Sequence, residues 1–398
     1  MPSLRRRTVS LRSAAAIGPR GQPLTHLAST EHGGPGIRSR VKQRVTLIAG
    51  ARPNFVKVAP LLRALARRKG IATSLVHTGQ HYSPALSDSF FRDLGLPAPD
   101  ASLAVGSGSH ARQVARVMVR LEEYLKRHPA DRLLVVGDVN STLAAALVGA
   151  KLNVPVDHVE AGLRSGDRSM PEEINRLATD SVASRLFASE PAAVRNLVAE
   201  GHPRDSIFLV GNVMIDSLVR LIPKARRLAA YRSLGLKRRR YGLVTLHRPS
   251  NVDDPERLRS LLDAIGECAR QLPLLLPAHP RTLRALRRLR LPEGLHILPP
   301  QGYLDFLSLM TFSQLVITDS GGVQEETTYL GVPCLTLRDS TERPITVTLG
   351  TNVLLGANPE RLPERVAAIL EGRHKRGARP ALWDGRAAER VADILARG

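Results

Sequence analysis

Two shortages in this sequence, of cysteine and of long apolar runs, exclude whole classes of protein. Only two cysteines, Cys268 and Cys334, occur in 398 residues. They cannot form a disulfide framework, and neither lies in a CxxC or Cys/His pattern typical of a zinc site. No run approaches the ~18 consecutive apolar residues that span a bilayer. We therefore expect a cytoplasmic protein with no membrane insertion and no bound metal.

Acidic residues are scarce relative to basic ones. The chain has 58 Lys and Arg against 36 Asp and Glu, a net charge of +22, which would suit nucleic acid, a membrane surface or a phosphorylated substrate. Aromatic residues make up only 4%, so the stacking platforms that hold single strands are rare. Much of the excess charge also lies in the N-terminal arm and on predicted helix surfaces. These features argue against nucleic-acid binding.

The pattern along the chain predicts two α/β domains. Residues 1–43 are basic and lack apolar periodicity, so we predict a disordered extension, and "SAAAI" is too short for the apolar core of a signal peptide. From residue 44 to about residue 212, short apolar strands alternate with helical patterns, the rhythm of a parallel sheet. A second such set follows the basic segment 224–240, giving predicted domains at 44–212 and 213–382. The last helix, at about 387–396, could pack on either.

Charged residues and glycines gather where the predicted strands end. Because open α/β folds bind ligands at the carboxyl ends of their strands, this pattern predicts one cleft lined from both domains. In chain order the residues are Gly50, Arg52 and Lys57; Gln80 and His81; Asp138; Glu160; His247 and Arg248; and Asp319, Ser320, Gly321 and Gly322.

Each of these motifs also has a purely structural interpretation. Gly50, Arg52 and Lys57 could form a phosphate grip or a tight turn with solvated charges. Ser320 is expected to cap the helix that follows it. The glycines after Ser320 would let backbone N–H groups approach an anion, or would simply begin a capped helix.

The segment "VEAGLRSGDRSMPEEINR" contains an unusual density of charge directly after an apolar strand. Glu172 and Arg176 stand four apart on a helix opened by Pro171, so we expect them to share a face. They could belong to the site or form an ordinary surface pair, a description that fits Glu173 better than Glu172. Asp138 could likewise be only a helix cap. The spacing of His81, His247 and His279 offers no metal pattern.

The motifs form an ordered set between residue 44 and about residue 356. They read "GARPNFVKVAPL", "HTGQHY", "VVGDVNSTLAAAL", "HVEAGLRSGDRSMPEEINR", "VGNVMID", "TLHRPSNVDDPE", "PAHPRT" and "TDSGGVQEETTYLGVPCLTLRDSTERP". As a set they are highly specific, and the chain resembles the non-hydrolysing UDP-N-acetylglucosamine 2-epimerases. The departures are Ala51 and Asn54, where many relatives carry Thr and Glu, and Met170, where an aromatic residue is common. They leave the sugar or acyl variant of the substrate open.

The resemblance implies a glycosyltransferase-B-like fold, in which two Rossmann-like domains face a cleft and the C-terminal helix, 383–398, packs back on the first. It implies reversible conversion of UDP-N-acetylglucosamine to UDP-N-acetylmannosamine in a homodimer, with a UDP-sugar as partner and no metal or redox cofactor. The C2 proton of such a sugar is only weakly acidic, so the route would eliminate UDP to 2-acetamidoglucal and then add it back. That chemistry requires carboxylates near C1 and C2, cations and N–H donors for UDP, and a closed cleft.

The resemblance also assigns roles to residues. Asp138, Glu160 and Glu172 would be the acid/base and charge-stabilising set, in an order that the sequence leaves open, and His247 would assist the departing diphosphate. Glu326 would bond the ribose. The residues that would bind UDP are Arg52, Lys57, Arg176, Ser320, Gly321, Gly322 and Arg343. Those that resemble an activator site for a second UDP-sugar are Gln80, His81 and His279.

Two other enzymes of the same fold stay open as alternatives. A hydrolysing epimerase would let water reach the glycal and release a free sugar. A nucleotide-sugar glycosyltransferase would share the phosphate loops. It would need an acceptor site and would not require three carboxylates around C1 and C2. A non-enzymatic polyanion-binding role is a more distant third.

Overall fold

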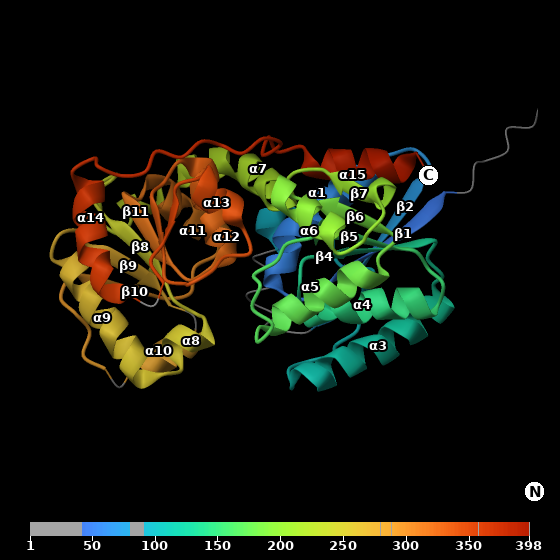
Figure 1. The fold of residues 1–398 in the computed structure, drawn as a ribbon, viewed down its shortest axis with the longest axis horizontal. Helices are drawn as coiled ribbons and strands as arrows, with labels where there is room; N and C mark the ends of the chain where they lie inside the picture. Colours follow the sequence, from blue (N-terminus) through green and yellow to red (C-terminus); the bar gives the residue numbers. More distant parts are fainter. Residues whose placement is uncertain (1–41, 80–90, 279, 288, 357, 398) are drawn as a thin grey trace, which may run out of the picture. The chain divides into compact units, whose positions relative to one another are not determined.

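Two parallel β-sheets with helices packed around them make up the described part of the chain, which is residues 42–79, 91–278, 280–287, 289–356 and 358–397 of a computed structural model (Figure 1). Within these ranges the first sheet has seven strands in the order β3-β2-β1-β4-β5-β6-β7, and the second has six in the order β10-β9-β8-β11-β12-β13. The predicted α/β class with two Rossmann-like sheets is confirmed.

The strands are short and most contain a run of apolar residues. In the first sheet they are β1 (Gln43–Ala49), β2 (Ile71–His77), β3 (Ala101–Ser102), β4 (Arg132–Val136), β5 (Val156–Ala161), β6 (Arg185–Ala188) and β7 (Ile207–Leu209). In the second they are β8 (Gly242–Thr245), β9 (Leu274–Pro277), β10 (Leu295–Leu298), β11 (Leu315–Thr318), β12 (Cys334–Thr336) and β13 (Asn352–Leu354). Such runs are typical of parallel strands covered on both faces.

Helices connect the strands, and several begin with proline at the first helical position, where its missing N–H is not needed. They are α1 (Arg52–Ala66), α3 (His110–Arg127), α4 (Asn140–Lys151), α5 (Pro171–Val182), α6 (Pro191–Ala199), α7 (Val213–Leu228), α8 (Pro249–Val252), α9 (Pro255–Ala269), α10 (Pro280–Leu286), α11 (Tyr303–Phe312), α12 (Gly321–Leu330), α13 (Pro344–Thr348), α14 (Leu362–Leu370) and α15 (Ala387–Ala396). Within the described ranges, none is both long and apolar enough to cross a bilayer.

The order of strands reverses direction at one point in each sheet. Strands β1 and β4 are neighbours in the first sheet, and β8 and β11 are neighbours in the second. At such a point the connections leave toward opposite sides, so a crevice opens at the carboxyl ends of the strands. Two crevices of this kind position the candidate site.

Helices α7 and α15 join the layers around the two sheets. Helix α7 packs against α1 beside the first sheet and against α11 beside the second. Because α7 contacts helices of both sheets, the domain boundary predicted between residues 212 and 213 stays a prediction. The sequence pattern alone left the partner of the last helix open, and in the structure α15 packs on α1 and α7 (Figure 1). Asp216 of α7 accepts the backbone N–H groups of Ala387 (3.1 Å) and Ala388 (2.7 Å), which caps α15. Strand β1 begins at Gln43, one residue before the predicted start of the domain.

Candidate active site

Glu160 lies at the end of β5 in a conformation that few side chains adopt. Its φ is +71°, and the pairing of β5 with β6 shifts register between Val159 and Ala161. A left-handed, non-glycine residue costs roughly 1–2 kcal/mol, and such strain gathers at functional sites. The irregularity aims a carboxylate that is only 3% exposed at the carboxyl edge of the sheet. Within the described ranges its Oε1 atom has no hydrogen-bond partner.

Lys57 is the ion-pair partner of Glu160. Its Nζ donates to Glu160 Oε2, and both side chains are buried. Gly137 leaves room for this pair, because a Cβ there would lie 3.3 Å from the Lys57 Nζ and 3.4 Å from the Glu160 Oε2. The sequence predicted that Lys57 holds UDP, whereas in the structure its charge is directed at a carboxylate.

Asp138, directly after β4, pairs with Arg176 of α5. Arg176 is 2% exposed and its guanidinium also donates to Glu173 Oε2, from Nε at 3.0 Å and from Nη2 at 2.6 Å. Glu173 in turn accepts the backbone N–H groups of Ser165 and Gly166, each at 3.0 Å. Burial acts to raise the pKa of Glu173, but these bonds and the Arg176 charge lower it. A buried chain of charges therefore holds the loop before α5 in place.

This arrangement corrects one expectation about α5. Glu173, which the sequence assigned to the surface, is buried and pairs with Arg176 three residues on. Glu172 is exposed. Its charge interacts with that of Arg248, which follows β8 of the second sheet. Glu172 therefore faces the other half of the site.

Arg248 makes further contacts between the two halves. Its Nη1 lies 4.0 Å from the sulfur of Met170, and its Nε donates to the carbonyl oxygen of Asp319 at 3.0 Å. Burial and the nearby charge of Arg338 lower its pKa. The sequence placed Arg248 at a strand end but gave it no role. Because it contacts residues of both halves, we include the Arg248 guanidinium among the cations of the candidate site.

His247 is held by Asp319, which follows β11. The Nδ1 of His247 lies 2.7 Å from Asp319 Oδ1, and the backbone N–H groups of His247 and Arg248 each lie 2.9 Å from Oδ2. Asp319 is fully buried; burial acts to raise its pKa, but the bond and charge of His247 lower it. Since Nδ1 is engaged and the imidazole is 49% exposed, Nε2 is the nitrogen available to a ligand. Sequence reasoning missed the role of Asp319, whose signal was its position in "TDSGG".

The start of α12 differs from the capped helix that we expected. Ser320 occupies the N-cap position, but its side chain makes no capping hydrogen bond to the described residues of α12. Gly321 instead allows close packing, because a Cβ there would lie 2.7 Å from Glu342 Oε1 and 2.8 Å from Arg343 Nη1. A side chain at position 321 would collide with this ion pair. Gly322 similarly lies against Met214 of α7.

Arg343 is the central cation of the second half. It is 6% exposed and pairs with Glu325 Oε1 and Glu342 Oε1, each at 2.7 Å. Burial alone would lower its pKa, but the charges of Glu325 and Glu342, and after them those of Glu160 and Asp138, raise it. Arg343 is therefore close enough to the carboxylates of the first sheet to interact with them. The two halves form one site.

Glu326, predicted to bond the ribose, is 4% exposed and accepts a hydrogen bond from the Tyr303 hydroxyl at 2.7 Å. Burial raises its pKa to about 7. The predictions for Arg52, Gln80, His81 and His279 fall on side chains outside the described part of the structure. In the part that is described, no group of three or more His, Cys, Asp and Glu side chains could hold a metal ion.

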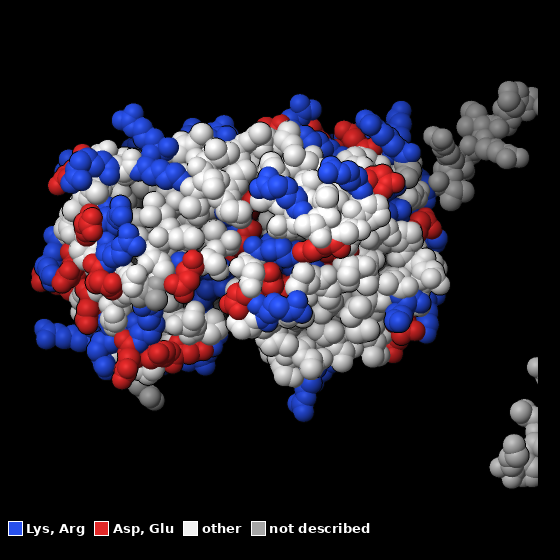
Figure 2. Space-filling view, viewed as in Figure 1, with Lys and Arg blue, Asp and Glu red and all other residues white. Residues whose placement is uncertain are grey.

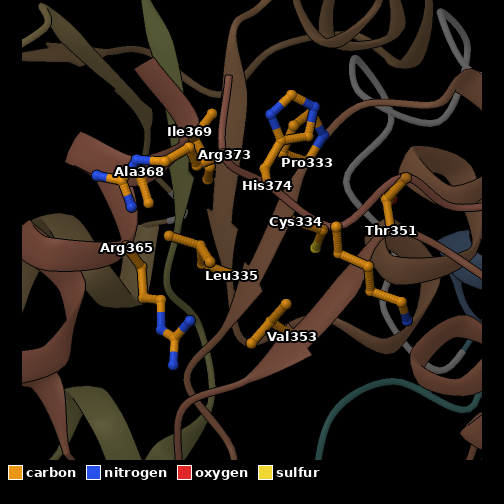
Figure 3. A pocket seen from close by; sticks show the side chains of 11 residues that line it. Pro333, Cys334, Leu335, Thr351, Val353, Arg365, Ala368, Ile369, Arg373 and His374 are labelled. Atoms are coloured by element: carbon orange, nitrogen blue, oxygen red, sulfur yellow. The ribbon is translucent and has the colours of Figure 1, made fainter. Parts of the chain in front are cut away.

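Two other features of the surface bear on the choice of site. Figure 2 shows basic and acidic side chains intermingled over one face of the molecule. A small cavity of about 90 Å³ lies between β12, β13 and α14, lined in part by Arg365, Arg373 and His374. The polar ends of these three side chains point in different directions (Figure 3). They do not converge on one anion, so this cavity is not the candidate site.

Comparison with known proteins agrees with this geometry. The family model described as UDP-N-acetylglucosamine 2-epimerase matches residues 63–396. The UDP-N-acetylglucosamine 2-epimerase of Methanocaldococcus jannaschii is 40% identical over 89% of this chain and 99% of its own. Its crystal structure in complex with UDP-GlcNAc and UDP superposes with a TM-score of 0.83, covering 89% of this chain and 100% of that one. The UDP-2,3-diacetamido-2,3-dideoxy-D-glucuronate 2-epimerase of Pseudomonas aeruginosa is also 40% identical, over 89% and 99% of the two chains.

Proposed function

This chain belongs to the UDP-N-acetylglucosamine 2-epimerase family, and we propose that it reversibly inverts C2 of UDP-N-acetylglucosamine to give UDP-N-acetylmannosamine. The observation that carries the proposal is the meeting of Asp138 and Glu160 from the first sheet with Arg343 from the second. Acid/base groups thereby interact with a cation across the two sheets. A nucleotide sugar requires this combination at its reacting carbons and its diphosphate.

The proposed reaction has two halves. The C1–O bond breaks first, UDP leaves with the bonding electrons, and a carboxylate takes the C2 proton, which gives 2-acetamidoglucal. A proton then returns to C2 on the opposite face, and UDP adds back to C1. Glu160 is suited to proton transfer because one of its oxygens is paired with Lys57 and the other finds no partner within the described ranges. Asp138 and Glu172 complete the set.

The ion pairs of the site suggest how the cations divide their roles. Lys57, Arg176 and Arg343 each neutralise a carboxylate, so direct binding of UDP by any of them would compete with an existing pair. We propose that Lys57 and Arg176 chiefly hold Glu160 and Asp138 in place. The departing diphosphate would then be met by His247, oriented by Asp319, and by the backbone N–H groups at the start of α12. The UDP contacts of Arg52, Ser320–Gly322 and Arg343, and the ribose contact of Glu326, stay part of the proposal.

The proposal extends to the setting of the enzyme. We infer a cytoplasmic homodimer that supplies precursors for cell-surface polysaccharide and closes its cleft on UDP. A second UDP-sugar could act as an activator at Gln80, His81 and His279. A second candidate substrate is UDP-2,3-diacetamido-2,3-dideoxy-D-glucuronate, which is favoured by the 40% identity to the relative named for it.

Incubation of the pure protein with UDP-N-acetylglucosamine alone, followed by proton NMR, tests the activity. We expect the manno epimer still attached to UDP, and in D₂O a deuteron at C2 of the product. Release of free N-acetylmannosamine would identify a hydrolysing enzyme, and no change without an acceptor would favour a glycosyltransferase. A parallel incubation with the diacetamido-glucuronate substrate decides between the two sugars.

A further inference from the structure

A histidine that the proposed reaction does not use lies directly behind the carboxylates. His158 is on β5, two residues before Glu160, and is completely buried. Its Nε2 lies 2.8 Å from the carbonyl oxygen of Gly137, and its Nδ1 lies 2.6 Å from Asp180 Oδ1 of α5. The ring therefore connects the end of β4 to the helix that carries Arg176.

Both neighbours of the ring are acceptors, which determines how many protons are present. A carbonyl oxygen can only accept, so Nε2 must carry a hydrogen. The Nδ1 faces a carboxylate oxygen, so a second proton must lie between the two for a hydrogen bond to form there. A neutral imidazole has only one ring proton and cannot make both bonds to an ionised Asp180. The buried pair must hold two protons.

The surroundings of Asp180 place the second proton on the histidine. Its other oxygen, Oδ2, accepts the backbone N–H of Gly162 at 3.0 Å and the Arg164 guanidinium at 2.7 Å. Arg164 is shared with Glu200 at 2.6 Å. Asp180, Arg164 and Glu200 are the charged partners of the network. The two donors at Oδ2 favour an ionised Asp180, and the ionised carboxylate stabilises an imidazolium that faces it.

The imidazolium lies close in the chain to both candidate catalytic groups. Gly137, whose carbonyl it binds, directly precedes Asp138, and the open side of Gly137 faces the Lys57 and Glu160 pair. A positive charge held at that peptide favours negative charge on the adjacent carboxylates. A rigid hydrogen bond there also limits how the strand ends can move.

We propose that His158 is a positioning residue, held as an imidazolium by Asp180, which fixes the Gly137–Asp138 peptide and places a positive charge behind Asp138 and Glu160. Its catalytic consequence rests on the proposed epimerase function, whereas its protonation does not. The substitution Asp180→Asn separates charge from geometry. The asparagine oxygen can keep the bonds from Gly162 and Arg164, while its NH₂ donates to a neutral His158 that still donates from Nε2.

Nitrogen-15 NMR of the full-length protein measures the protonation directly. We expect both ring nitrogens of wild-type His158 to be protonated at neutral pH, and only Nε2 to carry a proton in Asp180→Asn. The signals are assigned by their loss in His158→Gln. A wild-type His158 with one protonated nitrogen at neutral pH would overturn the proposal, whether or not any variant folds.

The pH profile of kcat/KM measures the effect on the carboxylates. Asp180→Asn removes both the imidazolium charge and the carboxylate that holds it. Because the imidazole is the nearer of the two to the Gly137 carbonyl, we expect the acid limb to move to higher pH. The matched control is Asp157→Asn, on the adjacent residue of β5, where another fully buried carboxylate binds Arg132 at 2.6 and 2.7 Å. An unchanged profile in Asp180→Asn, or an equal shift in Asp157→Asn, would refute the electrostatic role. Inactivity of the wild-type protein on UDP-N-acetylglucosamine would instead refute the proposed function and leave the NMR result standing.

Discussion

The pair between Lys57 and Glu160 makes a large and specific prediction about stability. Replacing Lys57 with methionine preserves the length of the side chain and removes its charge, so Glu160 is left buried at 3% exposure without its cation. Loss of one partner of a buried pair costs about 3–5 kcal/mol, much of it the penalty for the charge that stays behind. We therefore expect Lys57→Met to lower the free energy of unfolding by about that amount at pH 7, and to abolish most turnover.

A double-mutant cycle separates the pair from simple loss of packing. In Lys57→Met combined with Glu160→Gln no charge is left unpaired, so the double variant should be more stable than Lys57→Met alone by roughly 2 kcal/mol. The control is Asp131→Asn, which removes the exposed pair with Arg44, where the side chains are 38% and 51% exposed. Exposed pairs contribute about 0–1 kcal/mol.

Urea unfolding followed by both circular dichroism and fluorescence provides the assay. Coincidence of the two transitions tests whether one free energy describes a chain with two sheets. Two results would refute the argument that Glu160 is a buried charge dependent on Lys57. One is that Lys57→Met lowers the free energy of unfolding no more than Asp131→Asn does. The other is that adding Glu160→Gln to Lys57→Met lowers this free energy further, by as much as Glu160→Gln does alone.

Three further predictions concern the carboxylates and their neighbours. With UDP-N-acetylglucosamine as substrate, Glu160→Gln and Asp138→Asn should each lower kcat by roughly 10²-fold or more, with a smaller change in KM, because acid–base catalysis contributes on that scale. A near-normal kcat in both variants would mean that Glu160 and Asp138 have only a structural role. Asp319→Asn should lower kcat by about tenfold or more while the protein stays folded, because His247 loses the acceptor that orients it; an unchanged kcat would show that His247 needs no orientation. Burial, and after it the charge of Glu325, raises the pKa of Glu190 to about 7, so the folded state binds its proton more tightly than the unfolded state. The stabilisation is complete below about pH 4.5 and is lost as pH rises through about 7, by up to roughly 3 kcal/mol; Glu190→Gln should flatten the unfolding midpoint over this window, and an unaltered pH dependence would contradict the assignment.

The periodic features of the sequence were sufficient to predict the architecture. Apolar strands alternating with helical patterns predicted two parallel sheets, and the residues at strand ends predicted the edge at which Asp138, Glu160 and His247 lie. These inferences succeed because strand period and strand direction depend on local sequence. The rotation of a helix about its axis does not. On α5 both Glu172 and Glu173 are within reach of Arg176, and only packing against the sheet decides that Glu173 turns inward.

The supporting groups of the site were harder to predict, although a signal was present. In a strand buried on both faces, polar residues have no place unless each has a partner. Strand β5 reads "VDHVEA", and all six of its residues are buried. Asp157, His158 and Glu160 therefore had to find Arg132, Asp180 and Lys57. The sequence of β5 predicts that such partners exist, but which residues they are depends on which helix packs over which strand end.

The departures from ordinary folding rules in this chain are concentrated at the carboxyl edges of the two sheets. The left-handed backbone of Glu160 and the close packing at Gly321 occur within one or a few residues of the strand ends. Each departure costs free energy that an apolar side chain or a relaxed backbone would avoid. Buried, strained and paired charges persist where the surrounding sheets hold them in place and where reaction requires charge in a site closed to water. The same rigid strands that impose the strain on Glu160 fix its carboxylate relative to Lys57. We therefore infer that the pairs of charges at the two edges, rather than the net charge of the chain, are the part of its electrostatics that the proposed function requires.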